Sequence, residues 1–209
     1  AWSLAHGYQL RGDRAAALEY LKKALLISQA SGNMIMSVAS LTNLGQLYEL
    51  EKNLSLAKRS YKQVLKLICK PPLPYACGAL IGLAQIAYEH NKLSEAERYT
   101  QQSLELAQQL VNLDTPILCH LLLARVKVAR GDLGGAGLSI RLAEQYAEKN
   151  NIFHRLPDIA AAKACFFLQQ GELEKADELI KKHDLPLIRA RFLLARQDPQ
   201  SALDLLTPF

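Results

Sequence analysis

The side chains that could carry out chemistry are spread along this 209-residue sequence and form no recognisable catalytic motif. Catalysis needs a nucleophile, a base and an orienting group brought together, and neither a G-x-S-x-G nor an H-E-x-x-H motif occurs. The five histidines are far apart, at His6, His90, His120, His154 and His183. We therefore expect a protein that is not an enzyme and that needs no cofactor.

The cysteines do not predict a metal site. Cys69, Cys77, Cys119 and Cys165 are widely spaced, with no Cys-x-x-Cys pair and no histidine at ligand spacing. We expect reduced thiols, as is usual in the cytoplasm, and no bound metal. No run of about 18 apolar residues is present, so we also expect no membrane partner.

A glycine-rich stretch, Gly134-Gly135-x-Gly137, could be read as a phosphate-binding loop. It follows no predicted strand, however, and it stands where a helix should begin. We interpret it as a flexible helix start. The net charge of +5 is not concentrated on one face, which favours solvated helix surfaces over a nucleic-acid site.

A turn followed five residues later by an alanine recurs through the chain, as in Gly12-Asp13 and Ala17. These alanines are 40, 39, 40, 40 and 26 residues apart: Ala17, Ala57, Ala96, Ala136, Ala176 and Ala202. Twelve residues before each lies another small residue: Ala5, Gly45, Ala84, Ala124, Ala164 and Ala190. Small side chains allow two helices to cross closely, so the pattern predicts repeated two-helix hairpins.

The predicted helix pairs occupy about residues 1–31, 34–69, 75–111, 116–149, 157–183 and 186–207, with all eight prolines outside helix interiors. Asp13 and Asp132 are expected N-caps, Ser94 to Glu97 an expected capping box, and Gly32 an expected left-handed residue after a helix. The predicted fold is all-α, a right-handed superhelix (α-solenoid) of about six hairpins. We expect residues 1–209 to form one domain, a fragment of a longer protein.

The first helix of each hairpin should line a concave groove, with the residue after each small residue facing that groove. Residues three or four positions further share that face. Asn43, two positions before Gly45, should lie on the same side. The candidate ligand-binding residues are His6, Gln9, Asn43, Gln46, Glu49, Gln85, Tyr88, Arg125 and Arg191. Amides and tyrosine suit a sugar or a peptide backbone, and arginine suits a carboxylate or phosphate. The alternative is that these side chains are merely solvated.

The pattern Leu4-Ala5-x-x-Tyr8, Gly12-Asp13 and Ala17 resembles a tetratricopeptide repeat (TPR), as does Leu44-Gly45-x-x-Tyr48 with Ala57. The period near 40 is longer than the usual 34. In Leu80–Leu110, Leu121–Ala136 and Leu187–Pro208 the chain is similar to the repeat arm of the MalT-like family of large ATP-binding LuxR-type transcriptional regulators.

This resemblance implies a non-catalytic sensor and transduction arm that binds a small-molecule inducer, a peptide or a regulatory protein and controls self-association. It also implies that DNA and ATP are contacted only through modules absent from this fragment, since no G-x-x-x-x-G-K-[ST] loop and no DNA-reading helix is present. The alternative is a general TPR protein- or peptide-binding scaffold, or a quorum-peptide receptor.

Overall fold

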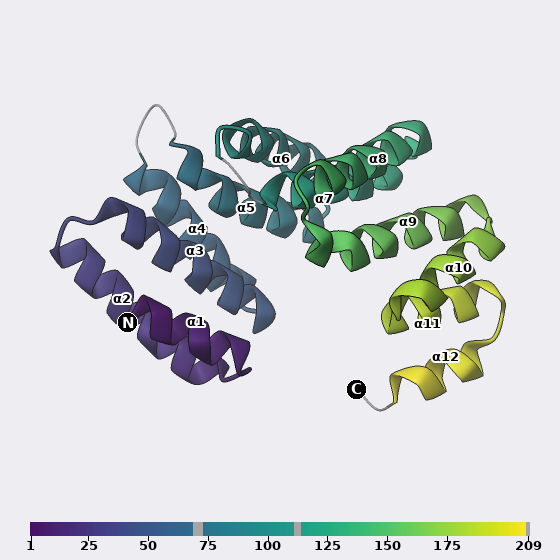
Figure 1. Ribbon diagram of the computed structural model, residues 1–209, viewed down its shortest axis with the longest axis horizontal. Coiled ribbons are helices and arrows are strands. Elements are labelled where there is room, and N and C mark those ends of the chain that lie inside the picture. The colour runs from purple at the N-terminus through teal and green to yellow at the C-terminus, as the bar shows by residue number, and fades with distance from the viewer. Residues whose placement is uncertain (69–72, 111–113, 208–209) are drawn as a thin grey trace. The chain divides into compact units, whose positions relative to one another are not determined.

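The computed structural model describes residues 1–68, 73–110 and 114–207, and in that part of the chain every regular element is helical (Figure 1). The contacts divide the chain into two compact units, Ala1–Thr115 and Pro116–Phe209. Each unit is described by itself. The predicted all-α repeat fold is confirmed; the ends of the second and third predicted pairs, and Cys69, lie outside the described residues.

The first unit consists of three helix pairs joined by short turns. They are α1 (Trp2–Leu10) with α2 (Arg14–Ala30), α3 (Met34–Leu50) with α4 (Leu54–Leu67), and α5 (Cys77–Glu89) with α6 (Leu93–Ala107). A 3₁₀ turn, η1 (Pro74–Ala76), precedes α5. Within this unit, each helix contacts the next helix along the chain, and α3 also contacts α5. The first helices of the second and third pairs are therefore neighbours.

The second unit continues the same pattern. Its helices are α7 (Thr115–Ala129), α8 (Leu133–Lys149), α9 (Leu156–Gln170), α10 (Leu173–His183), α11 (Pro186–Ala195) and α12 (Pro199–Leu206), with a 3₁₀ turn η2 (Phe153–Arg155) before α9. Pro157, Pro186 and Pro199 stand in the first turn of their helices, where the missing N–H group is not needed.

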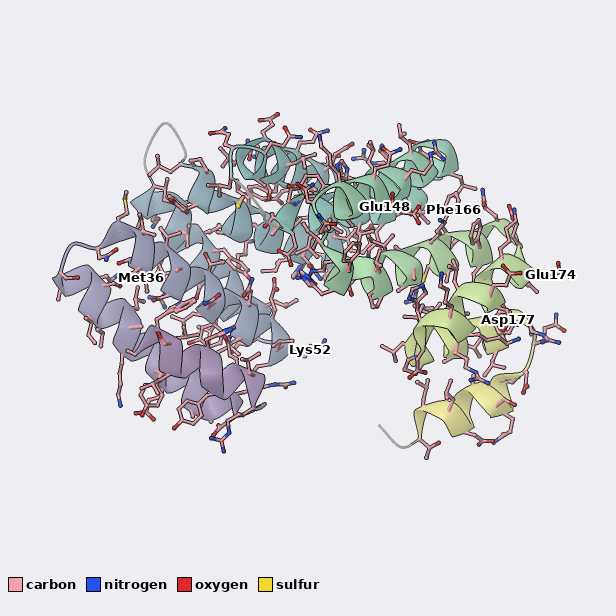
Figure 2. All side chains as sticks on the ribbon, in the orientation of Figure 1. Met36, Lys52, Glu148, Phe166, Glu174 and Asp177 are labelled. Atoms are coloured by element: carbon pink, nitrogen blue, oxygen red, sulfur yellow. The ribbon has the colours of Figure 1, made fainter. Side chains whose placement is uncertain are left out.

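The hairpin turns explain why the helices end where they do. The residue before the N-cap has a positive φ: Gly12 (77°), Gly131 (79°) and Gly171 (77°) supply it without strain, whereas Lys52 (60°) does so with a side chain. Figure 2 labels Lys52 at the α3–α4 turn. Gly32 also has the expected positive φ, of 66°.

Two of the predicted caps are confirmed and one is wrong. Asp13 accepts a hydrogen bond from Ala16 N at 3.0 Å, and Asp132 accepts one from Gly135 N at 2.8 Å. The predicted capping box at Ser94 is incorrect, because α6 begins at Leu93 and its N-cap is Lys92. The turn residue with positive φ is Asn91, so the helix begins directly after Lys92. The position of this turn decides where the helix starts, although serine is the better N-cap residue.

The recurrent small residues lie in the interior. Ala5, Ala17, Ala57, Ala84, Ala96, Ala136, Ala164 and Ala176 are fully buried, and Ala124, Ala190 and Ala202 nearly so. Gly45 is also buried. Their burial explains the constant spacing, because a larger side chain at a helix crossing would have to displace a packed neighbour.

Candidate functional site

Polar side chains on α3 and α5 form a candidate binding surface in the first unit. We call it the α3–α5 polar face and define it as Asn43, Gln46, Glu49, Gln85 and Tyr88. Gln46 and Gln85 are exposed, and the other three are half-buried. Because α3 contacts α5, the face joins two successive hairpins.

Beneath this face a tyrosine from the second helix of the hairpin is locked between the two first helices. Tyr61, on α4, is fully buried. A Cβ atom at Gly45 on α3 would lie 2.6 Å from Tyr61 Cζ, and a Cβ atom at Gly82 on α5 would lie 2.8 Å from its hydroxyl oxygen. Only glycine at both positions leaves room for the ring, so the two glycines fix where the hydroxyl points.

The Tyr61 hydroxyl lies beside the Glu49 carboxyl group. Burial is the main cause that raises the pKa of Glu49 to about 7; the Tyr61 hydroxyl opposes this rise and Glu89 on α5 adds to it. Burial and the nearby Glu49 charge likewise raise the pKa of Tyr61 above its ordinary value, so that its hydroxyl stays protonated. The site holds a carboxyl group near its titration point next to a neutral phenol.

Hydrogen bonding at this site is incomplete. The Tyr61 hydroxyl is the hydrogen-bonding neighbour of the Glu49 carboxyl group, although the contact between Tyr61 Oη and Glu49 Oε1 is not a well-aligned hydrogen bond. Thr42 Oγ1, two turns before Glu49 on α3, is also buried without a partner. Buried polar atoms are nearly always paired. Polar atoms are therefore buried at this helix contact, beneath the exposed side chains of the α3–α5 polar face.

The chemistry of this arrangement is recognition. Glutamine amides accept and donate hydrogen bonds to a peptide backbone, and two neighbouring carboxyl groups attract cations. In the part of the chain that the structure describes, no group of three or more His, Cys, Asp and Glu side chains could hold a metal ion. The exposed amides of Gln46 and Gln85 can both donate and accept hydrogen bonds.

The predicted residues of α1, His6 and Gln9, also belong to the first unit. His6 is exposed and stacks on Trp2, with ring centroids 5.9 Å apart and an interplanar angle of 7°. Gln9 is half-buried near the end of α1.

Arg125 and Arg191 belong to the second unit, and both are exposed. Arg191, on α11, directs a guanidinium nitrogen to within 3.7 Å of Cys165 Sγ on α9. Arg191 and Cys165 each follow the small residue of their repeat, Ala190 and Ala164.

The glycine-rich stretch lies at the start of α8, as interpreted. A Cβ atom at Gly135 would clash with the Asp132 carboxylate that caps the helix. Lys127 Nζ donates to Gly135 O at 3.3 Å and to Ser139 Oγ at 3.2 Å. The stretch therefore serves helix capping and interhelical packing, and it is not a loop open to phosphate.

Sequence reasoning missed three members of the site: Tyr61 as a polar group, Gly82 and Glu89. Tyr61 lies on the second helix of its hairpin, outside the predicted concave face. Gly82 falls outside the small positions of the repeat, so its contact with a side chain from the preceding hairpin left no signal. Glu89 could have been found, because it lies forty residues after Glu49, one repeat length further along.

The hairpins, their small crossing residues and their stacked first helices define the class of tetratricopeptide-type repeat proteins. Within this class, the chain belongs to the family of the MalT-like TPR region, whose model matches residues 1–209. The sequence-based assignment to a MalT-like repeat arm is confirmed at this level. The family match also supports a general function for this chain, that of a TPR protein-binding regulatory domain.

Solved structures of other repeat proteins share the fold. A putative kinesin light chain of Podosopora anserina with TPR-like repeats superposes with a TM-score of 0.61 at 19% identity, over 90% of this chain and 93% of that one. BtubC (BKLC) from P. vanneervenii gives 0.64 at 14% identity, over 95% and 89%. At these identities the likeness concerns the fold alone.

A curated relative corrects one prediction. The chain is 26% identical over 173 residues to response regulator aspartate phosphatase A of Bacillus subtilis (strain 168), and the match covers 79% of this chain and 43% of that protein. The prediction that the chain is not an enzyme is therefore wrong, because this relative is named as a phosphatase. Missing nucleophile and zinc motifs exclude only those reactions, and a repeat surface can supply single side chains to chemistry on a bound protein.

No helix of the described residues is both long enough and apolar enough to span a membrane.

Proposed function

We propose that this chain is the sensing arm of a MalT-like, LuxR-type transcriptional regulator, in which the α3–α5 polar face binds an inducer, a peptide or a regulatory protein. The family match over residues 1–209 supports the regulator. The single observation that carries the site is the set of polar side chains on two first helices that contact each other, Asn43, Gln46, Glu49, Gln85 and Tyr88. The free thiols Cys77, Cys119 and Cys165 support a reducing, cytoplasmic location.

Such an arm acts on self-association only if its ligand prefers one state of the parent protein. A ligand with equal affinity for both states shifts nothing, however tightly it binds. The proposed role therefore couples occupancy of the polar face to assembly of the whole regulator, with DNA and ATP bound through other modules.

The experiment is a thermal-unfolding screen of the chain against oligosaccharides, metabolites and short peptides. A ligand present at about 100 times its Kd should raise the free energy of unfolding by ~2.7 kcal/mol. A hit should be lost in Gln46→Ala, whose side chain is exposed and needed for no packing, and kept in the exposed α2 variant Lys22→Ala. A panel without any hit, repeated with the same result on the full regulator, would contradict the proposal.

A second candidate is a domain that acts on response regulators, and the phosphatase relative favours it. It predicts that the chain shortens the lifetime of the aspartyl phosphate on a response regulator from the same cell. Measuring phosphate release from phosphorylated response regulators, with and without the chain, separates this candidate from an inducer-sensing arm. Since the chain spans less than half of that relative, the same assay on the full-length protein is the required comparison.

A further inference from the structure

A small cleft lies among α4, the end of α5 and the first half of α6, within the first unit. Its apolar lining includes the buried residues Ile86 and Ala87 of α5 and the half-buried ring of Tyr99 on α6. At about 3.6 residues per turn, Ala87 lies on the side of α5 opposite Gln85. The cleft is therefore separate from the α3–α5 polar face.

The repeat pattern explains why the cleft is there. The third hairpin has Ala87 three residues after the small residue of its first helix, and the other hairpins have larger side chains at this position: Tyr8, Tyr48, Lys127, Phe167 and Leu193. In the first hairpin, Tyr8 stacks on Tyr20, with ring centroids 5.3 Å apart and an interplanar angle of 14°. Tyr99 is the counterpart of Tyr20 in the third hairpin, so it has an alanine and a cleft where Tyr20 has a ring.

The shape of the cleft defines the size of its guest. The space beside Tyr99 corresponds to the space that an aromatic ring occupies in the first hairpin, and paired rings contribute more than their buried area alone. Arg98 lies over one face of Tyr99, 4.2 Å from the ring centroid, so a guest ring meets the remaining part of that ring. The cleft measures about 30 Å³, whereas pockets that enclose small molecules measure about 300–1,000 Å³. It therefore takes the edge of one ring and not a whole metabolite.

Two lysines define the charge of the guest. Lys58 and Lys92 line the cleft and make no hydrogen bond or ion pair within the part of the chain that the structure describes. Four other hairpins have, at the position of Lys92, a side chain that accepts a hydrogen bond from the helix: Asp13, Asn53, Asp132 and Asp198. A cation at a helix N-terminus is unfavourable, so helix stability does not explain Lys92. Glu95 adds one carboxylate to the lining, and two ammonium groups against one carboxylate favour an acidic guest.

We propose that the cleft between Ala87 and Tyr99 anchors one aromatic side chain of a partner protein, whose neighbouring acidic residues pair with Lys58 and Lys92. The edge of the ring takes the position that Tyr8 takes in the first hairpin, and the rest of the partner lies on the surface of α4 and α6. This inference goes beyond the proposed function, because no residue of the α3–α5 polar face takes part. A protein held here leaves that face open to its own ligand.

The test titrates three blocked pentapeptides into the ¹⁵N-labelled full chain and follows the amide shifts. The first, Ac-Ala-Asp-Phe-Asp-Ala-NH₂, carries both the ring and the charges. In the second, alanine replaces phenylalanine and removes the ring; in the third, asparagine replaces both aspartates and removes the charges. The first peptide should shift amides around Ala87 and Tyr99, and the other two should bind about tenfold more weakly, because each lacks one of the two contacts.

Variants assign the cleft. Ala87→Tyr gives the third hairpin the tyrosine of the first two, so it should fold, raise the unfolding temperature and bind the first peptide about tenfold more weakly. Lys58→Gln should weaken the first peptide about threefold and leave the uncharged peptide unchanged. Its matched control is Lys62→Gln, which removes the same charge from an exposed position of α4 outside the cleft and should have no effect. The peptide comparison and Lys58→Gln keep the test decisive if Ala87→Tyr does not fold.

The inference is overturned if the peptide without the ring binds as tightly as the first, or if Lys62→Gln weakens binding as much as Lys58→Gln does. Unchanged binding by a folded Ala87→Tyr would also overturn it, because the ring would then bind elsewhere. 3-Phenylpropionate, a free aromatic acid, tests the source of the ring: if it binds as tightly as the first peptide, the cleft is a small-molecule site and not an anchor for a protein. Shifts confined to α3 around Gln46 would overturn the anchor and leave the proposed function standing.

Discussion

At the scale of single residues, the packing of the first unit depends on two glycines that leave room for one aromatic ring. Gly45→Ala should destabilise the chain by about 1–3 kcal/mol, because its Cβ atom would lie 2.6 Å from Tyr61 Cζ and the fully buried ring has no free space to move into. Urea unfolding followed by circular dichroism measures the change.

The matched control for this substitution is Gly7→Ala on α1. Nothing lies within 4 Å of a Cβ atom at Gly7, and alanine is the better helix former, so this variant should be more stable by about 0.5–1 kcal/mol. If both variants lost the same stability, helix propensity rather than the fit around Tyr61 would decide the result.

The Glu49 carboxyl group should make stability depend on pH. Its pKa is raised from 4.5 to about 7 in the folded chain, so the folded state holds a proton that the unfolded state releases. Its contribution is fully present below about pH 4.5 and is lost as pH rises through about 7. Relative to wild type, Glu49→Gln should therefore gain stability between pH 5 and pH 8.

The size of this gain is on the order of 1–2 kcal/mol, after allowance for the partial exposure of the side chain. It is measured as the difference in unfolding free energy between variant and wild type across the pH range. Glu19→Gln is the control, because the Lys23 ammonium lowers the pKa of Glu19 and the side chain is exposed. A difference that stayed flat with pH for Glu49→Gln would refute the altered pKa.

At the residue scale, the sequence pointed to the residues of the α3–α5 polar face but not to the buried contact beneath them. Asn43, Gln46, Glu49, Gln85 and Tyr88 follow from counting positions from the small residues, and these residues lie on two helices in contact. Counting could not show that a tyrosine from another helix reaches Glu49, because that contact depends on a three-dimensional fit. The resulting desolvation is invisible in a repeat pattern.

The hairpin turn is the element whose geometry is most constant, and it predicts a stabilising substitution. Lys52 has φ 60° at the turn position where Gly12 has φ 77°. A side chain in this region costs about 1–2 kcal/mol, and the entropy of glycine in the unfolded chain returns part of that. Lys52→Gly should therefore stabilise the chain by about 0.5 kcal/mol, measured by urea unfolding.

Lys62→Gly, on the exposed side of α4, is the control for the turn variant. It replaces lysine within a regular helix and should cost about 0.5–1 kcal/mol. Equal losses in the two variants would mean that the turn tolerates lysine without strain.

The helices were in general well predicted, because turn residues, prolines and alanines recur at the same positions in each repeat. The α6 N-cap at Lys92 was missed because Lys92 makes no side-chain cap hydrogen bond.

On the scale of the whole molecule, the repeat class followed from one spacing, and the family match agrees with it. The error about enzyme class belongs to this scale as well. Motif searches detect chemistry gathered in one stretch of sequence, whereas a repeat protein presents residues from several hairpins to a partner. What a repeat surface acts on therefore depends on the partner, about which its own spacing carries no information.

Cohesion within the first unit leads to the last prediction. Its two apolar clusters, one around Leu21 and Leu47 and one around Tyr61 and Leu80, are bridged by Leu25 and Tyr48, which pack against both. All members of both clusters lie within residues 1–110. A fragment of residues 1–110 should therefore unfold in a single transition, with Trp2 fluorescence, which reports on the first cluster, coinciding with circular dichroism.

Tyr48→Ala should break this coincidence in the fragment. Removing a half-buried aromatic side chain costs about 2–4 kcal/mol, and here the loss falls on the contact between two clusters. Neighbouring repeats are stabilised largely by such interfaces, so Trp2 fluorescence should change at lower urea concentration than circular dichroism does. Leu10→Ala, at a side chain that is 78% exposed, should keep the two curves together. Separate curves already in the unmodified fragment would show that Leu25 and Tyr48 do not couple the hairpins.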